Sequence, residues 1–461
     1  MPMPTQMLVQ DTMEEPASKV MKKVDISDVD MEKGSIIIEG KTKIVYELPK
    51  APGKCLVLSK DSITAYNGVM KNTLEGKASI STKTTCATFS ILENAGIKTS
   101  LIQKVDDKSF LAHRCSMIPI EWVTRRVATG SFLRRNEGVK EGYRFNPPKL
   151  EIFYKDDAKD DPQWSREMLE ESKLKCGNLV ITADEIDKME KMTVAIFEIL
   201  ERCWQTKNVS LIDMKIEFGV CSDTNEIILA DVIDNDSWRI WQNGDKRLMM
   251  DKQVYRNLRG TEITDVEMQN LKQNFTWVAD TCHQMAEEFR NSLEISKGQV
   301  VVLMGSASDK SHCEKILNTC DKLAVKCILR VTSAHKGTEE TLKILSKLEG
   351  ESLHIPTVII AVAGRSNGLG PVMAGNSCLP VINCPPVSAQ WATSDIWSSL
   401  RLPSGLGCAT IIDPEMAAQA AAQILAQHDV VVWSKLRVQL FSNWLKLKKA
   451  DMEMRREMQR E

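Results

Sequence analysis

The sequence predicts two domains of different fold class: a mixed α+β domain with antiparallel strands, followed by an α/β domain with a parallel sheet. The chain has 461 residues, whereas one domain usually has about 100 to 200. Near the start, short strand-like runs such as SIIIEG and CLVLS are broken by Gly and Pro, which is typical of antiparallel strands and tight turns. In the second half, continuous apolar runs such as QVVVLM and TVIIAVAG alternate with helical segments. This pattern indicates a parallel sheet covered on both faces.

The elements of the first domain can be assigned in order. We expect residues 1–32 to form a flexible tail and residues 33–293 to form the domain. Its first element is an antiparallel sheet between Gly34 and Leu58. A helix is expected at 191–204, where the apolar residues of KMTVAIFEILERCW recur at helical spacing. The runs LIDMKIEFGV and EIILADVID, joined by the turn SDTN, then predict a hairpin of two strands.

The second domain is expected at residues 298–461, after a polar helix at 266–293 and the junction EISKG. Its strands are QVVVLM, KCILRV, TVIIAVAG and PVINCP, with helical segments between them. From Pro414 onward the sequence is helical, and it becomes increasingly charged after Lys446. We expect its end to be a solvated or subunit-bridging helix.

Composition excludes several classes of partner and compartment. Lys and Arg number 60 against 62 Asp and Glu, a formal net charge of −2, so we expect neither a nucleic acid nor a membrane partner. The N-terminus has no pattern of a secretory or transit signal, and no apolar run approaches the ~18 residues that a membrane helix needs. The 13 cysteines contain no CxxC pair, which favours reduced thiols in a cytoplasmic protein.

Three charged residues alternate along the strand LIDMKIEFG. Asp213, Lys215 and Glu217 share one face of this strand. An ordinary solvent-exposed face is one explanation. The other is a cation site, because the partner strand ends at Asp231 and Mg²⁺ prefers one or two carboxylates together with water and substrate phosphates. Lys215 between two acids could then neutralise a phosphate or an acyl phosphate.

Two further segments of the first half are basic. EGKTKIVYEL places Lys41 and Lys43 on one side of a strand after Gly40, one way to hold nucleotide phosphates. The Walker pattern and the HRD and DFG triplets are absent, which disfavours a P-loop NTPase or a protein kinase. In PIEWVTRRVATGSFLRR, four arginines surround the turn at Gly130: Arg125, Arg126, Arg134 and Arg135. They fit a surface patch or a pocket for carboxylate or phosphate groups equally well.

Polar segments follow three consecutive strands of the predicted parallel sheet. The first segment offers Gly305, Ser306, Ser308 and Asp309, either a plain helix cap or an anion site. The second, RVTSAHKG, offers His335 and Lys336, and the third is AGRSNGLG. Open α/β sheets bind ligands at the carboxyl ends of their strands. Histidine is the usual acid/base group near neutral pH, so His335 is a catalytic candidate as well as a candidate structural histidine.

Taken together, these motifs resemble the family of animal bifunctional purine-biosynthesis enzymes. These join phosphoribosylaminoimidazolesuccinocarboxamide (SAICAR) synthetase to phosphoribosylaminoimidazole (AIR) carboxylase. The resemblance covers about residues 33–455. It depends on strings such as EGKTKIVYEL, NTLEGKASIS, IDMKIEFG and DVIDNDSWR, followed by MGSASD, VTSAHKG and VAGRSNGLGPVMAGN.

For the first domain, the resemblance implies a two-lobe ATP-binding fold of the SAICAR synthetase type. ATP phosphorylates the carboxylate of carboxyaminoimidazole ribotide (CAIR), and the amine of L-aspartate displaces phosphate. The implied ATP-binding residues are Lys41, Lys43, Glu217 and Asp231, of which Glu217 and Asp231 also bind Mg²⁺. Lys215 is the implied catalytic residue between these acids. The residues implied to bind CAIR or aspartate are Arg125, Ser131, Asp236 and Arg239.

For the second domain, the resemblance implies a flavodoxin-like three-layer α/β/α fold that carboxylates AIR with CO₂. No biotin, metal or ATP is needed for that step. His335 moves the C4 proton, and Lys336 contacts the substrate phosphate or the forming carboxylate. The residues implied to bind AIR or CO₂ are Gly305, Ser306, Ser308, Asp309, Ser333, Arg365, Ser366, Asn367 and Gly368. The segment AGRSNGLG replaces the GAAH-like segment of microbial relatives that rearrange an N-carboxylated substrate.

The resemblance also implies a homo-octamer assembled around the carboxylase domain. Two alternatives are a nucleotide-binding scaffold that has lost one activity and a kinase-like phosphotransferase. The charged residues of both expected sites are intact, which disfavours the scaffold, although fold alone does not guarantee function.

Overall fold

The computed structural model describes residues 29–258, 263–294, 297–388 and 392–458. Most of the expected tail, residues 1–28, therefore lies outside the described residues. Its last residues do have a structure: Val29 and Met31 pack against a small apolar cluster that includes Leu48. Lys50 lies 2.9 Å from Asp30 and 2.7 Å from Glu32, so the packed part of the first domain begins before Lys33.

The first lobe is an antiparallel sheet of five strands in the order β1-β2-β3-β7-β6. Its strands are β1 (Ile36–Glu39), β2 (Lys43–Glu47), β3 (Lys54–Ser59), β6 (Leu101–Lys104) and β7 (Ser109–His113). The expected antiparallel sheet is confirmed. Helix α1 (Lys77–Ala95) covers one face, where Phe89 and Leu92 join the main hydrophobic core. Strands β4 (Ser62–Ala65) and β5 (Met70–Thr73) form a separate antiparallel hairpin in this lobe.

The second lobe is built on two long strands, β8 (Cys115–Val127) and β13 (Val209–Cys221), which pair antiparallel. Around them lie β9 (Arg144–Tyr154), β10 (Gln163–Trp164), β14 (Ile227–Ala230) and β15 (Trp238–Gln242). The expected hairpin is confirmed, with Glu217 opposite Ala230. Helix α4 (Ala183–Gln205) contains the predicted helix and starts earlier, at a capping box of Thr182 and Glu185.

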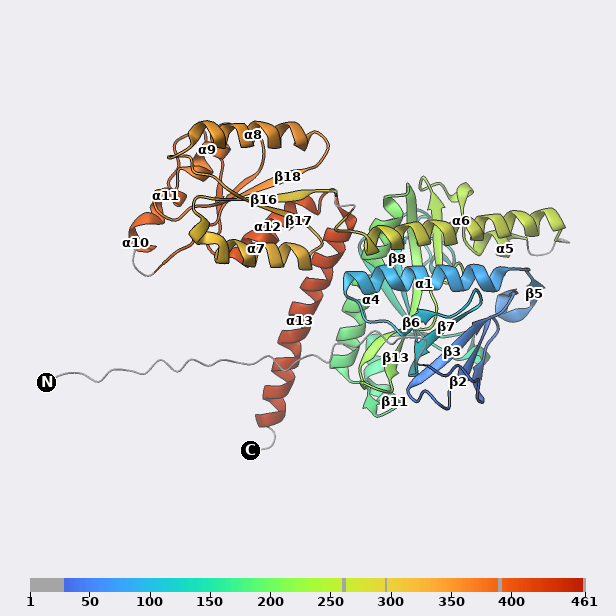
Figure 1. Cartoon of the computed structure of the whole chain (residues 1–461). Helices are drawn as coiled ribbons and strands as arrows, with labels where there is room; N and C mark the ends of the chain where they lie inside the picture. The colour runs from blue at the N-terminus through green and yellow to red at the C-terminus, as the bar shows by residue number, and fades with distance from the viewer. Residues whose placement is uncertain (1–28, 259–262, 295–296, 389–391, 459–461) are drawn as a thin grey trace.

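Shorter elements and one long helix complete the first domain. The short elements are α2 (Ser131–Arg135), α3 (Arg166–Ser172), α5 (Gln253–Asn257), β11 (Lys175–Cys176) and β12 (Leu179–Val180). The predicted polar helix is α6 (Asp265–Arg290), which lies beside α1 (Figure 1). Its Phe275 packs with Ile63 and Tyr255, and its Phe289 belongs to the main core.

The second domain is a three-layer α/β/α structure, as the sequence predicts. All five strands are parallel, in the order β17-β16-β18-β19-β20. They are β16 (Gln299–Met304), β17 (Lys326–Val331), β18 (Thr357–Val362), β19 (Val381–Asn383) and β20 (Ala409–Thr410). One face packs on α7 (Lys310–Lys322) and α12 (Pro414–Leu425), and the other on α8 (Thr338–Ser352) and α9 (Leu369–Gly375) (Figure 1). Two short helices follow, α10 (Ala392–Asp395) and α11 (Trp397–Leu400).

The last helix, α13 (Val430–Met458), adds a contact that the sequence did not predict. We expected its charged end to be a solvated or subunit-bridging helix, and residues 449–458 are indeed mostly exposed. The earlier part of α13, however, leaves the second domain and lies against the first domain of the same chain (Figure 1). Lys448 and Arg455, in the charged part, contact Asp184 of α4. The helix was predictable from its composition, whereas its partner was not.

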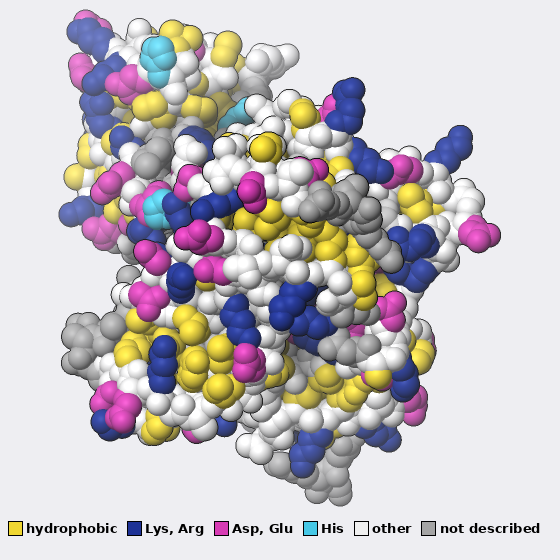
Figure 2. All heavy atoms as spheres, turned by 90° about the vertical axis from the view of Figure 1, so that its right-hand side faces the viewer, with side chains coloured by type: hydrophobic (Ala, Val, Ile, Leu, Met, Phe, Trp, Pro, Cys, Tyr) yellow, Lys and Arg dark blue, Asp and Glu magenta, His cyan; other side chains and the backbone are white. Residues whose placement is uncertain are grey.

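The surface and helices agree with the composition. On the face turned to the viewer in Figure 2, acidic and basic side chains are interspersed and hydrophobic side chains form separate patches. Within the described part of the chain, none of the helices combines the length and hydropathy needed to span a membrane.

Candidate active sites

The first domain contains a cavity of about 680 Å³ between its strands and α2. Five residues expected to bind or transform substrates line it: Arg125, Ser131, Lys215, Asp236 and Arg239. Strand β13 supplies Lys215 and strand β15 supplies Arg239. A smaller cavity of about 400 Å³ shares Ser131, Arg134 and Arg239 with it. The expected residues Lys41, Lys43, Glu217 and Asp231 are not among those that line this cavity.

Lys215 is the centre of a charged cluster beside this cavity. Its Nζ lies 2.6 Å from Oε1 of Glu217, 3.1 Å from Oε1 of Glu121 and 3.9 Å from Oδ2 of Asp231. Burial opposes its charge, but Glu217 and Glu121 raise the pKa of Lys215 above its usual value. Glu217 is only 2% exposed, so this strand face is not an ordinary solvent face.

Glu217 is held as a carboxylate by two lysines. Burial raises its pKa, but the charges of Lys215 and Lys155 outweigh that effect and hold the pKa at about 2. Lys155 Nζ lies 2.8 Å from Oε2 of Glu217. Because Ala230 pairs with Glu217, the next residue, Asp231, lies beside it. Both acids are therefore ionised or ion-paired at the same end of the hairpin.

The two nucleotide-strand lysines do not lie as expected. Lys43 begins β2 and forms an ion pair with Asp231, which joins the first lobe to the second. Lys41 lies in the turn before β2, where the Gly40 amide donates to the Lys43 carbonyl. The two lysines therefore do not share one face of a strand.

The acids of this cluster fit a magnesium ion. In the described ranges, no three His, Cys, Asp or Glu side chains form a group that could hold a metal ion. Mg²⁺ needs fewer protein ligands, because it keeps several waters and takes its other ligands from substrate phosphates. Glu217 and Asp231 are the two acids of this cluster that could supply its protein ligands. In this structure Glu217 pairs with Lys215 and Lys155, and Asp231 pairs with Lys43.

The arginines serve two purposes. Arg125 is buried, with Nη1 2.7 Å from Oδ2 of Asp213 and an ion pair from Nε to Glu151. Arg239 Nη1 lies 3.1 Å from the same Asp213 oxygen. Arg125 therefore holds the central strands together, while its Nη2 donates to Ser131 Oγ at 3.4 Å. The arginines of α2 line the cavity, so the segment is partly structural and partly a pocket wall.

Three basic residues at this site were missed by sequence reasoning. Lys77 is 1% exposed, and its Nζ lies 3.4 Å from Oδ2 of Asp236. Lys252 Nζ lies 3.2 Å from the same oxygen. Burial raises the pKa of Asp236, but these two lysines overcome it and hold the pKa at about 2. Arg256 lines both cavities. Of these three residues, only Lys77 lies in a motif that supports the family resemblance, NTLEGKASIS.

The second domain contains a cavity of about 690 Å³ where the predicted strand ends meet. The expected residues that line it are Gly305, Ser306, Ser308, Asp309, Ser333, His335, Lys336, Arg365, Ser366 and Gly368. The Ser306 hydroxyl accepts from the Ser308 amide at 3.3 Å and from its hydroxyl at 2.8 Å. Burial raises the pKa of Asp309. The meeting of the three segments follows from the parallel order of β16, β17 and β18.

Asn367 is not among the lining residues, contrary to our expectation. Its side chain is buried, and Nδ2 donates to Asn383 Oδ1 at 2.9 Å and to Ser399 Oγ at 3.0 Å. Its Oδ1 accepts from the Gly370 amide at 3.2 Å. Asn367 therefore anchors the AGRSNGLG turn to Asn383 and Ser399, on the side away from the cavity.

Comparison with known proteins identifies both halves. The family model for SAICAR synthetase matches residues 36–273, and that for AIR carboxylase matches residues 299–442. The multifunctional protein ADE2 of Gallus gallus is 56% identical, over 92% of this chain and 97% of its own length. The chain belongs to the bifunctional AIR carboxylase/SAICAR synthetase family. It is thus a bifunctional enzyme of purine biosynthesis, and the scaffold alternative is not favoured.

A human protein and one solved structure are also similar to this chain. The human bifunctional phosphoribosylaminoimidazole carboxylase/succinocarboxamide synthetase is 55% identical, over 92% of this chain and 97% of its own length. Among solved structures, the phosphoribosylaminoimidazole-succinocarboxamide synthase of Ehrlichia chaffeensis is 28% identical with a TM-score of 0.48. That match covers 54% of this chain and 98% of the solved chain. In this bifunctional family member, the 680 Å³ cavity lies in the synthetase domain and the 690 Å³ cavity in the carboxylase domain.

Proposed function

We propose that the carboxylase domain converts AIR and CO₂ to CAIR without ATP or biotin. The synthetase domain then joins CAIR to L-aspartate, using MgATP, to give SAICAR, ADP and phosphate. The observation that supports this most directly is that each domain has a cavity lined by many of its expected residues, among them Lys215 and Arg239 in the first domain and His335 and Lys336 in the second.

In the synthetase reaction, a carboxylate oxygen of CAIR attacks the γ-phosphorus of ATP, and the bond to ADP breaks. The amine of L-aspartate then attacks the acyl carbon, and phosphate leaves as the amide forms. Such phosphoryl transfer needs charge placement more than acid/base chemistry. Lys215, within 4 Å of three carboxylates beside the cavity, is the residue that neutralises the transferring phosphoryl group. Mg²⁺ held by Glu217 and Asp231 would shield the nucleotide phosphates, and Lys41 and Lys43 would complete the ATP site.

CAIR and aspartate are anions, and the two cavities, which share lining residues, are rich in cations. Arg134, Arg239 and Arg256 line both cavities with Ser131. Arginine binds phosphate and carboxylate oxygens bidentately. We assign the phosphate of CAIR or the carboxylates of aspartate to these arginines. Arg125 and Asp236 also line the first cavity, beside their ion pairs with Asp213 and Lys77.

In the carboxylase reaction, C4 of the enamine-like aminoimidazole attacks CO₂, and the C4 proton is then removed. His335 takes this proton, and Lys336 pairs with the substrate phosphate or the new carboxylate. Ser306, Ser308, Asp309 and Ser333 hold the ribotide, while Arg365, Ser366 and the Gly305 and Gly368 backbones complete the cavity wall. Asn367 acts through the turn that it anchors.

Assembly and compartment form the last part of the proposal. The second domain exposes large apolar side chains, with Trp397 56%, Leu400 51% and Ile412 51% exposed. Such groups on one domain favour self-association, and we propose a homo-octamer.

All 13 cysteines are free thiols, which supports a cytoplasmic enzyme. Light scattering of the purified chain measures the oligomeric state, and imaging of the tagged protein in cells shows its compartment.

Product analysis by mass spectrometry tests the activity. The purified chain receives AIR and bicarbonate, with and without MgATP and L-aspartate. CAIR is expected without ATP, and SAICAR only when all components are present. If no CAIR forms without ATP while supplied CAIR still becomes SAICAR, the direct use of CO₂ is wrong and the synthetase assignment stands. Replacing Mg²⁺ by EDTA should stop SAICAR formation alone.

A further inference from the structure

One helix contributes to the hydrophobic cores of both domains. Val432 and Leu436 of α13 belong to the core of the carboxylase domain. Val438 and Phe441, less than two turns further on, belong to the main core of the synthetase domain. Trp433 packs against both cores. Since α13 rises about 1.5 Å per residue, the two cores lie within one short stretch of the same helix.

The synthetase domain receives α13 in a groove between α4 and the end of α1. Gly96 ends α1 at a positive φ of 110°, and a Cβ there would lie 3.1 Å from Cγ1 of Val438. The Arg202 guanidinium of α4 lies over the Trp433 ring, 4.0 Å from its centre. The Lys191 ammonium lies 5.0 Å from the centre of the Trp444 ring. The helix therefore fits the groove closely along several turns.

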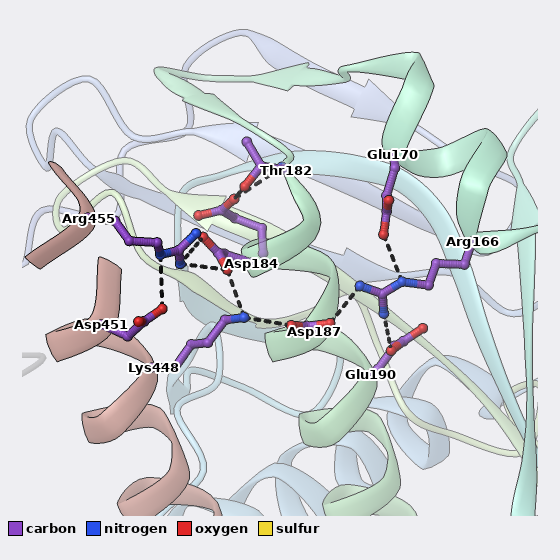
Figure 3. A network of polar contacts seen from close by, with 10 residues as sticks. Arg166, Glu170, Thr182, Asp184, Asp187, Glu190, Lys448, Asp451 and Arg455 are labelled. Carbon is purple, nitrogen blue, oxygen red and sulfur yellow. Dashed lines mark hydrogen bonds and ion pairs between the residues drawn. The ribbon is translucent and has the colours of Figure 1, made fainter. Parts of the chain in front are cut away.

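Charges on both sides of the groove are matched. Arg437 Nε lies 2.6 Å from Oε2 of Glu198, and Lys448 Nζ lies 2.8 Å from both Asp184 and Asp187. Figure 3 shows this network continuing across α4 to Arg166, which also contacts Asp187 at 2.6 Å. The groups of α4 and α13 are half-buried, so these pairs are screened less than ordinary surface pairs.

The groove lies directly behind the synthetase site. Helix α4 packs on β13, the strand of Lys215 and Glu217, within the same hydrophobic core. Glu201 of α4 accepts from Nε of Arg126 at 2.6 Å, beside Arg125 on β8. Displacement of α13 would therefore uncover the helix that supports the strands of the site.

We propose that α13 is the permanent occupant of this groove in the same chain and that it makes the two catalytic domains one cooperative unit. In this arrangement, α4 of the synthetase domain opens only when α13 is released. The connection is built in cis, because residues of one continuous helix enter both cores. It goes beyond either activity and does not depend on the assigned reactions.

Hydrogen exchange of the full-length chain, followed by mass spectrometry, tests the proposal. The double variant Arg437→Ala/Lys448→Ala removes the charges that tie α13 to α4. Lys446→Ala is the matched control, since Lys446 lies on the same helix but is exposed. We expect amides of 183–205 to exchange at least tenfold faster in the double variant and at the wild-type rate in the control. Because Val432 and Leu436 of α13 share the core of β16 and β18, a cooperative unit also requires these two strands to exchange faster in the double variant and at the wild-type rate in the control.

Equal protection of 183–205 in the double variant and the wild type would overturn the proposal. The pair Glu198→Arg and Arg437→Glu provides a second test that does not depend on a loss of charge. Each single change should speed exchange, and the combined variant should restore protection. Lack of recovery also counts against the contact. Hydrogen exchange at several protein concentrations distinguishes α13 of the same chain from α13 of a second copy. If the protection of 183–205 decreases on dilution, a second copy supplies the helix and the proposal is wrong.

Discussion

Gly368 approaches His335 so closely that no side chain fits between them. A Cβ built on Gly368 would lie 2.7 Å from Nε2 and 3.0 Å from Cε1 of the imidazole. Gly368 stands just before α9, and His335 follows β17, so two strand ends converge at this contact. The ring that we assign to proton transfer is exposed and lies against the backbone of Gly368.

Substitution Gly368→Ala should displace the imidazole and lower the carboxylation rate by about 100-fold, because a misplacement of about 1 Å costs that much. SAICAR formation from supplied CAIR should not change. The matched control is Gly350→Ala on α8, where nothing lies within 4 Å of the added Cβ. Parallel assays of both reactions measure the effect. An unchanged carboxylation rate in Gly368→Ala would mean that the ring position is not critical.

Substitution His335→Ala should abolish carboxylation and leave the synthetase active on supplied CAIR. General acid/base groups contribute about 10²- to 10⁴-fold to rates, so a loss in this range is expected. His354→Ala serves as control, since His354 is exposed at the end of α8. Retained carboxylation in the variant would remove His335 from the proton-transfer role.

Substitution Lys215→Ala should stop SAICAR formation by about 10²- to 10³-fold, the usual effect of removing one group that stabilises transition-state charge. The fold should persist because Lys155 still pairs with Glu217 and Lys43 with Asp231. Carboxylation by the same sample reports the integrity of the rest of the chain. Lys175→Ala, at an exposed position of β11, is the matched control. A loss of both activities would point to misfolding and contradict the assignment.

Asp251 should make stability depend on pH. Burial raises its pKa to about 6, against the effect of the Gln253 and Ile240 amides that donate to it. A raised pKa in the folded state gives stability that is present below the unfolded value of 3.8 and lost as pH rises through about 6. Relative to wild type, Asp251→Asn should therefore gain up to about 3 kcal/mol between pH 4 and pH 7.

Urea unfolding at a series of pH values measures this difference. The exposed residue Asp321 on α7 supplies the control, Asp321→Asn, whose curve should run parallel to that of the wild type. If Asp251→Asn also runs parallel, the buried carboxyl does not titrate in this range. The gap between the wild-type and Asp251→Asn curves should widen from about pH 4 to about pH 7 and stay constant above that.

The carboxylase site could be predicted because it depends on topology. Three parallel strands end at one edge of a sheet, so His335, Ser306 and Ser366 had to lie close together. The same reasoning placed Glu217 beside Asp231, since a hairpin fixes which residues pair. In both cases local sequence pattern determines the geometry.

Other features depend on contacts that the local pattern does not encode. An amide such as Asn367 looks the same in sequence whether it faces a ligand or the backbone behind it. Lys77 is the first residue of a helix, where a cation is unfavourable, and its burial against Asp236 becomes clear only from the fold. Lys41 lies in a turn because the hairpin closes between Gly40 and Lys43.

The packing of α13 also sets an order of events during synthesis. The groove on the synthetase domain is complete once α6 has been made, but its occupant begins at Val430. At about 5 to 20 residues per second, a ribosome needs on the order of ten seconds to make the intervening carboxylase domain. A synthetase domain that folds during that time leaves uncovered the apolar surface on which Val438 and Phe441 later pack. The newborn chain is thus most open to misassembly, and to chaperones, just before its last helix emerges.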